Sequence, residues 1–236
     1  MQILNQRQKL LVIAPHPDDE VLGAGGLIQK VKQAGGQVFV LYLTVGDTQD
    51  FSQKGNSTIT ERQREIRSVV TALGIDAYDT GHIGSSHLRH DVLGRLEVMS
   101  LIERKSKVAL EKIKPDIVAF PSLYSYNQDH QLAARATHAA LRPAENGIKH
   151  FVKTVLAYEV PADSWSMHHQ IVPNFFVPLT SKELKLKQQA MRLYASQMRP
   201  WPNPRSLAAI AALARLRGAH CVSDYAESYV GYRYVL

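Results

Sequence analysis

The chain has 236 residues, of which 45% are hydrophobic and 21% are charged, and its formal net charge is +7. This length suits one large α/β domain or two small ones and is enough to bury a sizeable core. The composition is ordinary for a globular protein. The positive charge is spread too widely along the chain to indicate a nucleic-acid partner. The single cysteine, Cys221, excludes an internal disulfide and a zinc site made of thiolates.

The N-terminal segment does not have the pattern of a secretion signal. Its apolar run follows a polar start, is short, and lacks a small-residue cleavage site. The apolar stretch 207–214 is too short to cross a bilayer. We therefore expect a cytoplasmic protein without a membrane partner.

Strands and helices are expected to alternate along the chain. Short apolar runs predict buried strands, and apolar residues at helical spacing predict helices. This alternation predicts an α/β, Rossmann-like fold with a mostly parallel sheet and helices on both faces. In chain order we expect a strand at 9–15, a helix at 20–36, a strand at 37–44, helices at 58–75 and 100–116, a strand at 116–122, a helix at 129–144, strands at 152–160 and 174–180, and helices at 181–197 and 206–219.

Two polar clusters follow predicted strands. The first is PHPDDE at residues 15–20, and the second is PSLYSYNQDH at residues 121–130. In open parallel sheets, ligands bind beyond the carboxyl ends of the strands. We therefore expect the two clusters to form one site at that edge of the sheet.

The residue types in these clusters suit a catalytic zinc site. Imidazole nitrogen and carboxylate oxygen are ordinary zinc ligands, and a catalytic zinc takes three protein ligands. The expected ligands are His16, Asp19 and His130, and the neighbouring Asp18 is placed to take a proton from an attacking water. A simpler interpretation stays open, because acidic residues at a helix start also cap free amides and interact with the helix dipole.

The glycine-rich run at residues 23–26 is not a dinucleotide motif. In the G-x-G-x-x-G frame that starts at Gly23, the last glycine position is occupied by Ile28. We expect these glycines to allow a helix to pack closely against a strand.

The PHPDDE motif followed by a glycine-rich helix resembles the LmbE-like (PIG-L) family of zinc-dependent N-acetylglucosamine deacetylases. The segment 61–75 is similar to that family's Arg-x-x-Glu helix ending in Leu-Gly. Segments 158–165, 175–197 and 205–229 are similar to its C-terminal part, including a lysine-rich helix that ends in Tyr-x-Ser-Gln. The resemblance implies a single LmbE-like domain over residues 1–236, with the metal site at the carboxyl ends of the strands.

The resemblance also implies a set of roles. His16, Asp19 and His130 would hold Zn²⁺ or another divalent transition metal, with Asp18 as general base. The family's second motif is usually His-x-Asp-His, and here it reads NQDH. Asn127 thus replaces a histidine that helps to polarise the carbonyl or to protonate the leaving amine, and Asp129 matches the acid that orients a histidine.

The implied reaction is hydrolysis of the N-acetyl group of an N-acetylglucosamine-type glycoside or conjugate, giving acetate and a free amino sugar. The changed second motif leaves an alternative, a non-catalytic protein or one of altered chemistry that binds a sugar or nucleotide on the same fold. The expected partner is a small amino-sugar conjugate, with an anionic one among the options. A homo-oligomer stays open.

Substrate contacts are expected from Arg62 and Arg64 on the helix after the second strand, from Tyr126, and from His87 in the segment 79–91, which is interpreted as a loop. Loops at strand ends often carry specificity. Residues 181–217 concentrate basic side chains. For these the favoured interpretation is a solvated helix face, and the alternative is a rim that attracts an anionic substrate.

Overall fold

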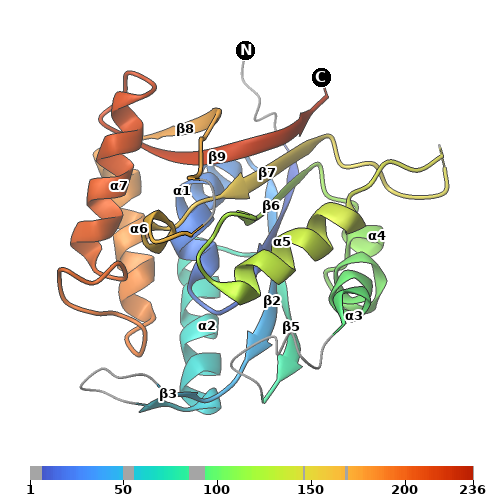
Figure 1. Cartoon of the computed structure of the whole chain (residues 1–236), viewed down its shortest axis with the longest axis horizontal. Helices are drawn as coiled ribbons and strands as arrows, with labels where there is room; N and C mark the ends of the chain where they lie inside the picture. The colour runs from blue at the N-terminus through green and yellow to red at the C-terminus, as the bar shows by residue number, and fades with distance from the viewer. Residues whose placement is uncertain (1–6, 50–55, 85–93, 146, 168–169, 236) are drawn as a thin grey trace.

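A seven-stranded sheet forms the centre of the molecule, in the order β5-β2-β1-β6-β7-β9-β8 (Figure 1). The computed structural model describes residues 7–49, 56–84, 94–145, 147–167 and 170–235. Strands β5, β2, β1, β6 and β7 run parallel to one another, and β9 is antiparallel to both β7 and β8. The expected mostly parallel α/β fold is therefore confirmed. The strands are β1 (Lys9–Ala14), β2 (Gln37–Val45), β5 (Ala77–Ile83), β6 (Ile117–Pro121), β7 (Thr154–Tyr158), β8 (Phe175–Leu179) and β9 (Tyr225–Tyr234), and β3 (Thr48–Gln49) pairs with β4 (Asn56–Ser57) in a separate ribbon.

Helices cover both faces of the sheet, and each face has its own apolar core. One core includes residues from α1, α2, α6 and α7, and the other includes residues from α3, α4 and α5. Figure 1 shows the two groups on opposite sides. The helices are α1 (Asp19–Gln33), α2 (Ile59–Leu73), α3 (Arg95–Ser100), α4 (Leu110–Ile113), α5 (Gln128–Ala140), α6 (Ser181–Leu193) and α7 (Leu207–Ala219), with a π-helical turn at Leu101–Lys105 and a 3₁₀ turn at Pro161–Ser164.

Strand β1 is central because its side chains are apolar on both faces. Residues 10–14 are fully buried, as expected for a strand of a parallel sheet that is covered on both sides. From β1 the chain builds outward through β2 and β5, and then returns to start the other half at β6. The strand order therefore reverses between β1 and β6, where a doubly wound sheet leaves a crevice at its carboxyl edge.

The predicted helix over 100–116 is wrong as a single element. A π turn follows α3 and ends at Lys105, and a short separate helix, α4, follows. The break lies at Ser106, whose backbone is extended and whose hydroxyl accepts from the amide of Val108. Such local side-chain bonds compete with the helical pattern.

Two strands of the seven-stranded sheet were not predicted, and neither was the small β3–β4 ribbon. Strand β5 runs through the first part of the segment that was interpreted as a loop, and its residues are partly exposed rather than an apolar run. Strand β9 carries Glu227 and Ser228 in a buried stretch. Buried polar side chains interrupt the apolar signal by which a central strand is found. None of the helices in the described ranges is long and apolar enough to cross a membrane.

Candidate active site

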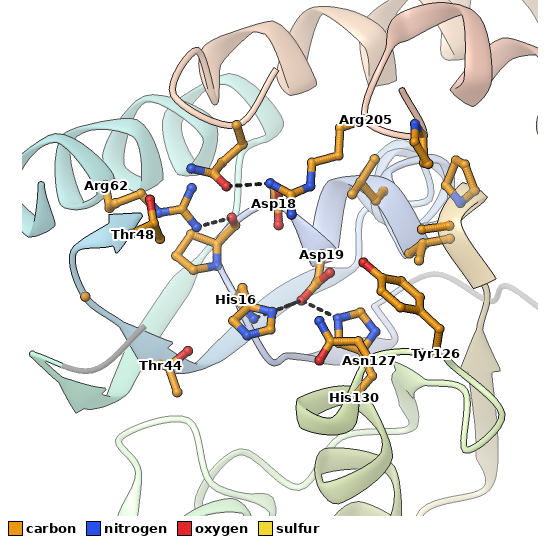
Figure 2. Close-up of a pocket in the computed structure, with 18 residues that line it drawn as sticks. His16, Asp18, Asp19, Thr44, Thr48, Arg62, Tyr126, Asn127, His130 and Arg205 are labelled. Atoms are coloured by element: carbon orange, nitrogen blue, oxygen red, sulfur yellow. Dashed lines mark hydrogen bonds and ion pairs between the residues drawn. The ribbon is translucent and has the colours of Figure 1, made fainter. Parts of the chain in front are cut away.

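A cavity of about 160 Å³ opens at the carboxyl edge of the sheet, where the strand order reverses. Its walls come from the segments that follow β1, β2, β6 and β7, from α2, and from the segment before α7. Figure 2 shows side chains from these elements pointing toward one another. The segment after β1 is fixed by Thr44 of β2, whose amide and hydroxyl both donate to the carbonyl of Pro15, at 3.0 and 2.9 Å. The two polar clusters found in the sequence thus meet in one cavity.

His16, Asp19 and His130 converge on one point of this cavity. Each offers one ligand atom, and these atoms lie within 4.8 Å of one another. Asp19 Oδ2 is central, 3.3 Å from His16 Nδ1 and 3.2 Å from His130 Nε2. Two imidazole nitrogens and a carboxylate oxygen are a donor set that zinc accepts in catalytic sites. The residues present therefore fit a zinc-type cation.

Asp129 orients His16 through the ring nitrogen that does not face Asp19. His16 Nε2 lies 2.8 Å from Asp129 Oδ2, and Nδ1 faces Asp19 Oδ2 at 3.3 Å. A carboxylate on the second ring nitrogen is the usual way to orient a metal-binding histidine. Burial alone would lower the pKa of His16, but its hydrogen bonds to Asp129 and Asp19, and their charges, raise this pKa to about 9. The positive charge of the protonated His16 ring thus offsets the nearby carboxylates, as a bound cation would.

Asp19 itself stays ionised despite its burial. Burial would raise its pKa, but the charge and hydrogen bond of His130, followed by those of His16, hold the pKa well below its usual range. Its carboxylate also accepts from the amide of His16 at 2.9 Å. A carboxylate fixed in this way is preorganised as a ligand.

Asp18 has a different environment from Asp19. Its side chain lines the cavity, and the residue is 5% exposed. Burial and the neighbouring charge of Asp19 raise its pKa to about 6, against the opposing effect of Arg205 and Arg62. Asp18 also has φ 123° and ψ −25°, a conformation that side-chain-bearing residues rarely adopt and that typically costs about 1–3 kcal/mol. Strain of this kind is often found at functional sites.

Asn127 caps helix α5 and also lines the cavity. Its side-chain oxygen accepts from the amide of Asp129 at 2.9 Å, which satisfies a free donor of the first helical turn. The carboxamide nitrogen is the part of the side chain that can donate a hydrogen bond toward a bound group. The cap also places Asp129 and His130 on the first turn of the helix.

The structure brings some of the predicted substrate residues to the cavity. Tyr126 lines it and is 41% exposed. Arg62 lines it too, but its guanidinium is buried and donates to the carbonyl of Pro17 at 2.7 Å. Arg64 is exposed on α2 and is not among the cavity-lining residues. His87 lies outside the described residues.

Sequence motifs also connect this site to known proteins. The profile of the family described as GlcNAc-PI de-N-acetylase, PIG-L, matches residues 11–141, a range that contains both polar clusters. The chain belongs to the PIG-L family.

Its relatives share most of their length with it. Diacetylchitobiose deacetylase of Thermococcus kodakarensis is 28% identical over 203 residues, which cover 82% of this chain and 71% of that protein. Among solved structures, the conserved protein TT1542 of Thermus thermophilus has a TM-score of 0.70 at 27% identity, with 96% of each chain covered.

The fold of the PIG-L family is not limited to one reaction. The 4-carboxy-2-hydroxymuconate hydratase GalB of Pseudomonas putida matches with a TM-score of 0.74 at 21% identity, covering 97% of this chain and 98% of that one. Function therefore has to be argued from the site and not from the fold.

The basic segment 181–217 is a solvated face only in part: Lys182, Lys185, Arg192 and Arg215 are exposed, as the favoured interpretation expects, but Lys187, Arg205 and Arg217 have other roles. Arg205 lines the cavity and donates to Gln197 Oε1 at 3.0 Å. Lys187 is 5% exposed and lies 2.6 Å from Glu227, and Arg217 binds Glu159 through two nitrogens, at 2.6 and 2.8 Å. The partners of Lys187 and Arg217 lie 40 and 58 residues away in the sequence, which is why no local pattern reveals these two pairs.

The glycines of α1 allow close packing, as expected. A Cβ at Gly23 would lie 2.2 Å from the ring of Tyr158 on β7, and one at Gly26 would lie 2.6 Å from Leu179 on β8. Both approaches are shorter than any side chain tolerates. The glycine run therefore brings the helix that carries Asp19 close to the sheet.

Proposed function

We propose that the chain is a metal-dependent amidohydrolase that removes the N-acetyl group of an N-acetylglucosamine-type glycoside or conjugate. The observation that carries this proposal is the convergence of His16, Asp19 and His130 beside the buried carboxylate of Asp18. Membership of the PIG-L family and the deacetylase named among the relatives support it.

His16, Asp19 and His130 would hold the cation, which when bound supplies a Lewis acid for the amide carbonyl. Asp129 keeps His16 in the tautomer that can ligate. The helix cap made by Asn127 fixes the direction from which His130 enters the cavity. These residues therefore prepare a rigid site before any substrate arrives.

Asp18 acts as the general base in this proposal. Its carboxylate accepts a proton from the attacking water as the water oxygen bonds to the acetyl carbon, a step that a positioned base accelerates by about 10²–10⁴-fold. With a pKa of about 6 in the cation-free chain, Asp18 is ionised at neutral pH. When the bond from carbon to nitrogen breaks, the same proton passes to the leaving amine, so the products are acetate and a free amino sugar.

Asn127 would stabilise the oxygen that becomes negative during the reaction. Its carboxamide nitrogen donates a hydrogen bond but cannot transfer a proton, so the leaving amine receives its proton from Asp18. Tyr126, which also lines the cavity, has a pKa raised by burial and stays a neutral donor at physiological pH. It would bind a substrate hydroxyl or carbonyl at the mouth of the cavity.

Metal analysis together with a substrate screen tests this function. The purified protein should contain about one divalent transition-metal ion per chain, and His130→Ala should lose most of it. A panel of N-acetyl amino sugars and their glycosides should yield free amine and acetate in equal amounts. Binding of these sugars without amine release would favour the non-catalytic alternative, and full metal retention by His130→Ala would contradict the ligand assignment.

A further inference from the structure

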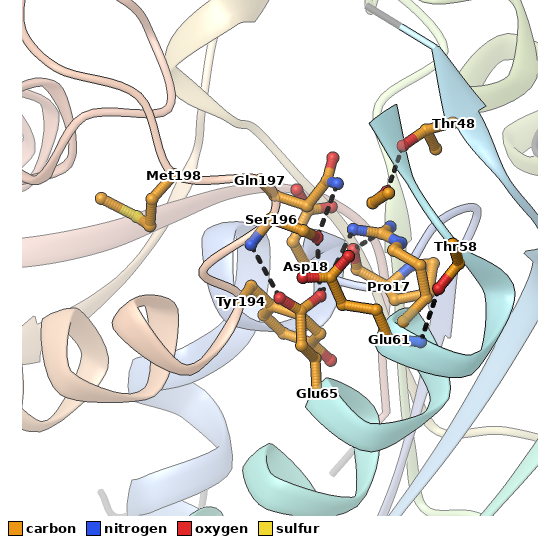
Figure 3. A network of polar contacts seen from close by, with 12 residues as sticks. Pro17, Asp18, Thr48, Thr58, Glu61, Glu65, Tyr194, Ser196, Gln197 and Met198 are labelled. Carbon is orange, nitrogen blue, oxygen red and sulfur yellow. Dashed lines mark hydrogen bonds and ion pairs between the residues drawn. The ribbon is translucent and has the colours of Figure 1, made fainter. Parts of the chain in front are cut away.

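The segment after α6, residues 194–197, supports the site from behind. It contains the Tyr-x-Ser-Gln pattern seen in the sequence. The amide and hydroxyl of Ser196 both donate to Glu65 of α2, each at 2.7 Å, and Figure 3 shows this contact beside Asp18 and Tyr194. The hydroxyl of Tyr194 donates to Glu20 Oε1 at 2.6 Å. This segment therefore ties α2 to the first turn of α1.

Glu20 links Tyr194 to the proposed base. The residue is fully buried, and each of its two carboxylate oxygens has a separate partner. Oε1 accepts from Tyr194, and Oε2 accepts from the backbone amide of Asp18 at 3.2 Å. Glu20 does not line the cavity, so it has no direct route to a substrate.

The peptide group between Pro17 and Asp18, whose amide donates to Glu20, also has a partner on its carbonyl side. The carbonyl of Pro17 and the amide of Asp18 belong to one planar peptide unit. Arg62 donates to that carbonyl at 2.7 Å, while Glu20 accepts from that amide. The orientation of this plane is what φ of Asp18 describes, and φ is 123°, outside the range that a residue with a side chain adopts without support.

We propose that Glu20, held by Tyr194, and Arg62 clamp the Pro17–Asp18 peptide group and thereby aim the Asp18 carboxylate into the cavity. Glu20, Tyr194 and Arg62 are then positioning residues that act through Asp18. The proposal rests on the proposed function, in which Asp18 is the base. In this proposal Arg62 holds the Pro17 carbonyl of the PHPDDE motif, in place of the substrate contact expected from the sequence.

The kinetic test compares variants that keep or remove the acceptor at residue 20. Glu20→Gln keeps an oxygen for the Asp18 amide, and its NH₂ can donate to the Tyr194 oxygen. Glu20→Met has similar length and no acceptor. We expect Glu20→Gln to stay within about tenfold of wild-type kcat and Glu20→Met to lose about 10²-fold or more, the effect of misplacing a general base. KM and metal content should change little in both.

Tyr194→Phe gives a milder variant if Glu20→Met does not fold. It removes the Tyr194 hydroxyl, while the neighbouring Tyr42 hydroxyl still faces Glu20, and we expect an intermediate fall in kcat of about tenfold. The matched control is Tyr229→Phe. Tyr229 is also fully buried and donates to a buried glutamate, Glu227 Oε2, at 2.7 Å, but it lies outside the cavity lining. Its kcat should equal that of the wild type.

A structural readout separates this proposal from the function it rests on. Crystal structures of wild type, Glu20→Gln and Tyr194→Phe report φ of Asp18 whether or not any N-acetyl sugar is hydrolysed. We expect a positive φ in wild type and Glu20→Gln, and a rotated or disordered peptide 17–18 in Tyr194→Phe. An unchanged φ in Tyr194→Phe, or wild-type kcat in Glu20→Met with metal bound, would overturn the clamp. Absence of hydrolysis by the wild type would overturn only the proposed function.

Discussion

Two buried charged clusters contact the same helix, α1, at different points. At the middle of the helix, Glu227 accepts from the amides of Gly26 and Leu27 at 2.6 and 2.8 Å, and Lys187 donates to the carbonyl of Leu22 at 2.8 Å. Lys187 and Glu227 also pair directly at 2.6 Å. Every charge of this mid-helix cluster, Lys187 and Glu227, thus has an opposite partner and backbone contacts.

The first turn of α1 is different. Asp18, Asp19 and Glu20 are consecutive and buried. Burial and neighbouring carboxylates raise the pKa of Asp18 to about 6, and burial raises that of Glu20 to about 7. Like charges this close resist ionisation together unless a cation or a proton is supplied. Buried charge by itself therefore does not mark a site: the mid-helix cluster is balanced within the fold, while the raised pKa values of Asp18 and Glu20 support the proposed cation site.

Breaking the mid-helix pair should damage stability without damaging the site. Lys187→Met leaves Glu227 buried without its cation, and loss of one partner of a buried pair costs about 3–5 kcal/mol. Chemical denaturation should show this loss in the free energy of unfolding. Lys185→Met, an exposed lysine on the same helix, should stay within about 0.5 kcal/mol of wild type. Metal content of folded Lys187→Met should equal that of the wild type. Loss of the metal in this variant would contradict the separation of the mid-helix cluster from the site.

Asn127→Ala should affect the site strongly and the fold weakly. Loss of one donor to a developing oxyanion lowers turnover by about 10²–10³-fold. Loss of the helix cap lowers the unfolding free energy by about 1 kcal/mol. Asn127→His should add a titrating group near neutrality to the pH–rate profile. Wild-type turnover in Asn127→Ala would show that residue 127 does not face the reacting carbonyl.

Asp129→Asn should weaken metal binding while keeping the site assembled. The carboxamide oxygen still accepts from His16 Nε2 but without the charge, and such changes behind a ligand lower metal affinity by about 10–100-fold. Competition with a chromophoric chelator measures this affinity. Asp116→Asn is the control, because Asp116 makes a similar single bond, to the amide of Lys9, at the opposite end of β1. Equal affinities for the two variants would argue against the role of Asp129.

The pH dependence of stability should differ between metal-free and metal-loaded protein. His16 has a folded-state pKa raised from 6.5 to about 9, so its contribution to stability is fully present below pH 6.5 and is lost as pH rises through 9. The melting temperature of chelator-treated protein should therefore fall between these limits. With zinc in excess, His16 is unprotonated and this fall should disappear. If the metal-free His16→Gln variant shows the same fall in melting temperature, the fall belongs to a titratable group other than His16.

The sequence was sufficient for the order of most elements and for placing His16, Asp19 and His130 in one cavity, because buried strands and the polar clusters that follow them are local signals. Buried apolar runs such as residues 10–14 read as strands, and His16 and Asp19 sit in one short motif. The features that the sequence did not predict depend on contacts between residues far apart in the chain. The contact of Glu20 with Tyr194 joins residues 174 positions apart, and that of Lys187 with Glu227 joins residues 40 positions apart. Strand β9 was not predicted because its buried face carries Glu227. A sequence pattern treats a charged residue as exposed, but here Lys187 and other partners compensate the buried charge.

In the proposed function, the start of α1 is a catalytic metal site in which Asp18 is the base and Asp19 a ligand. Measuring metal content and amine release on one preparation of Asp18→Asn tests it most directly. The substitution is nearly isosteric and removes the negative charge together with the ability to accept a proton. We expect wild-type metal content with hydrolysis reduced by about 10²–10⁴-fold. Hydrolysis within a few-fold of wild type, or loss of the metal, would contradict it.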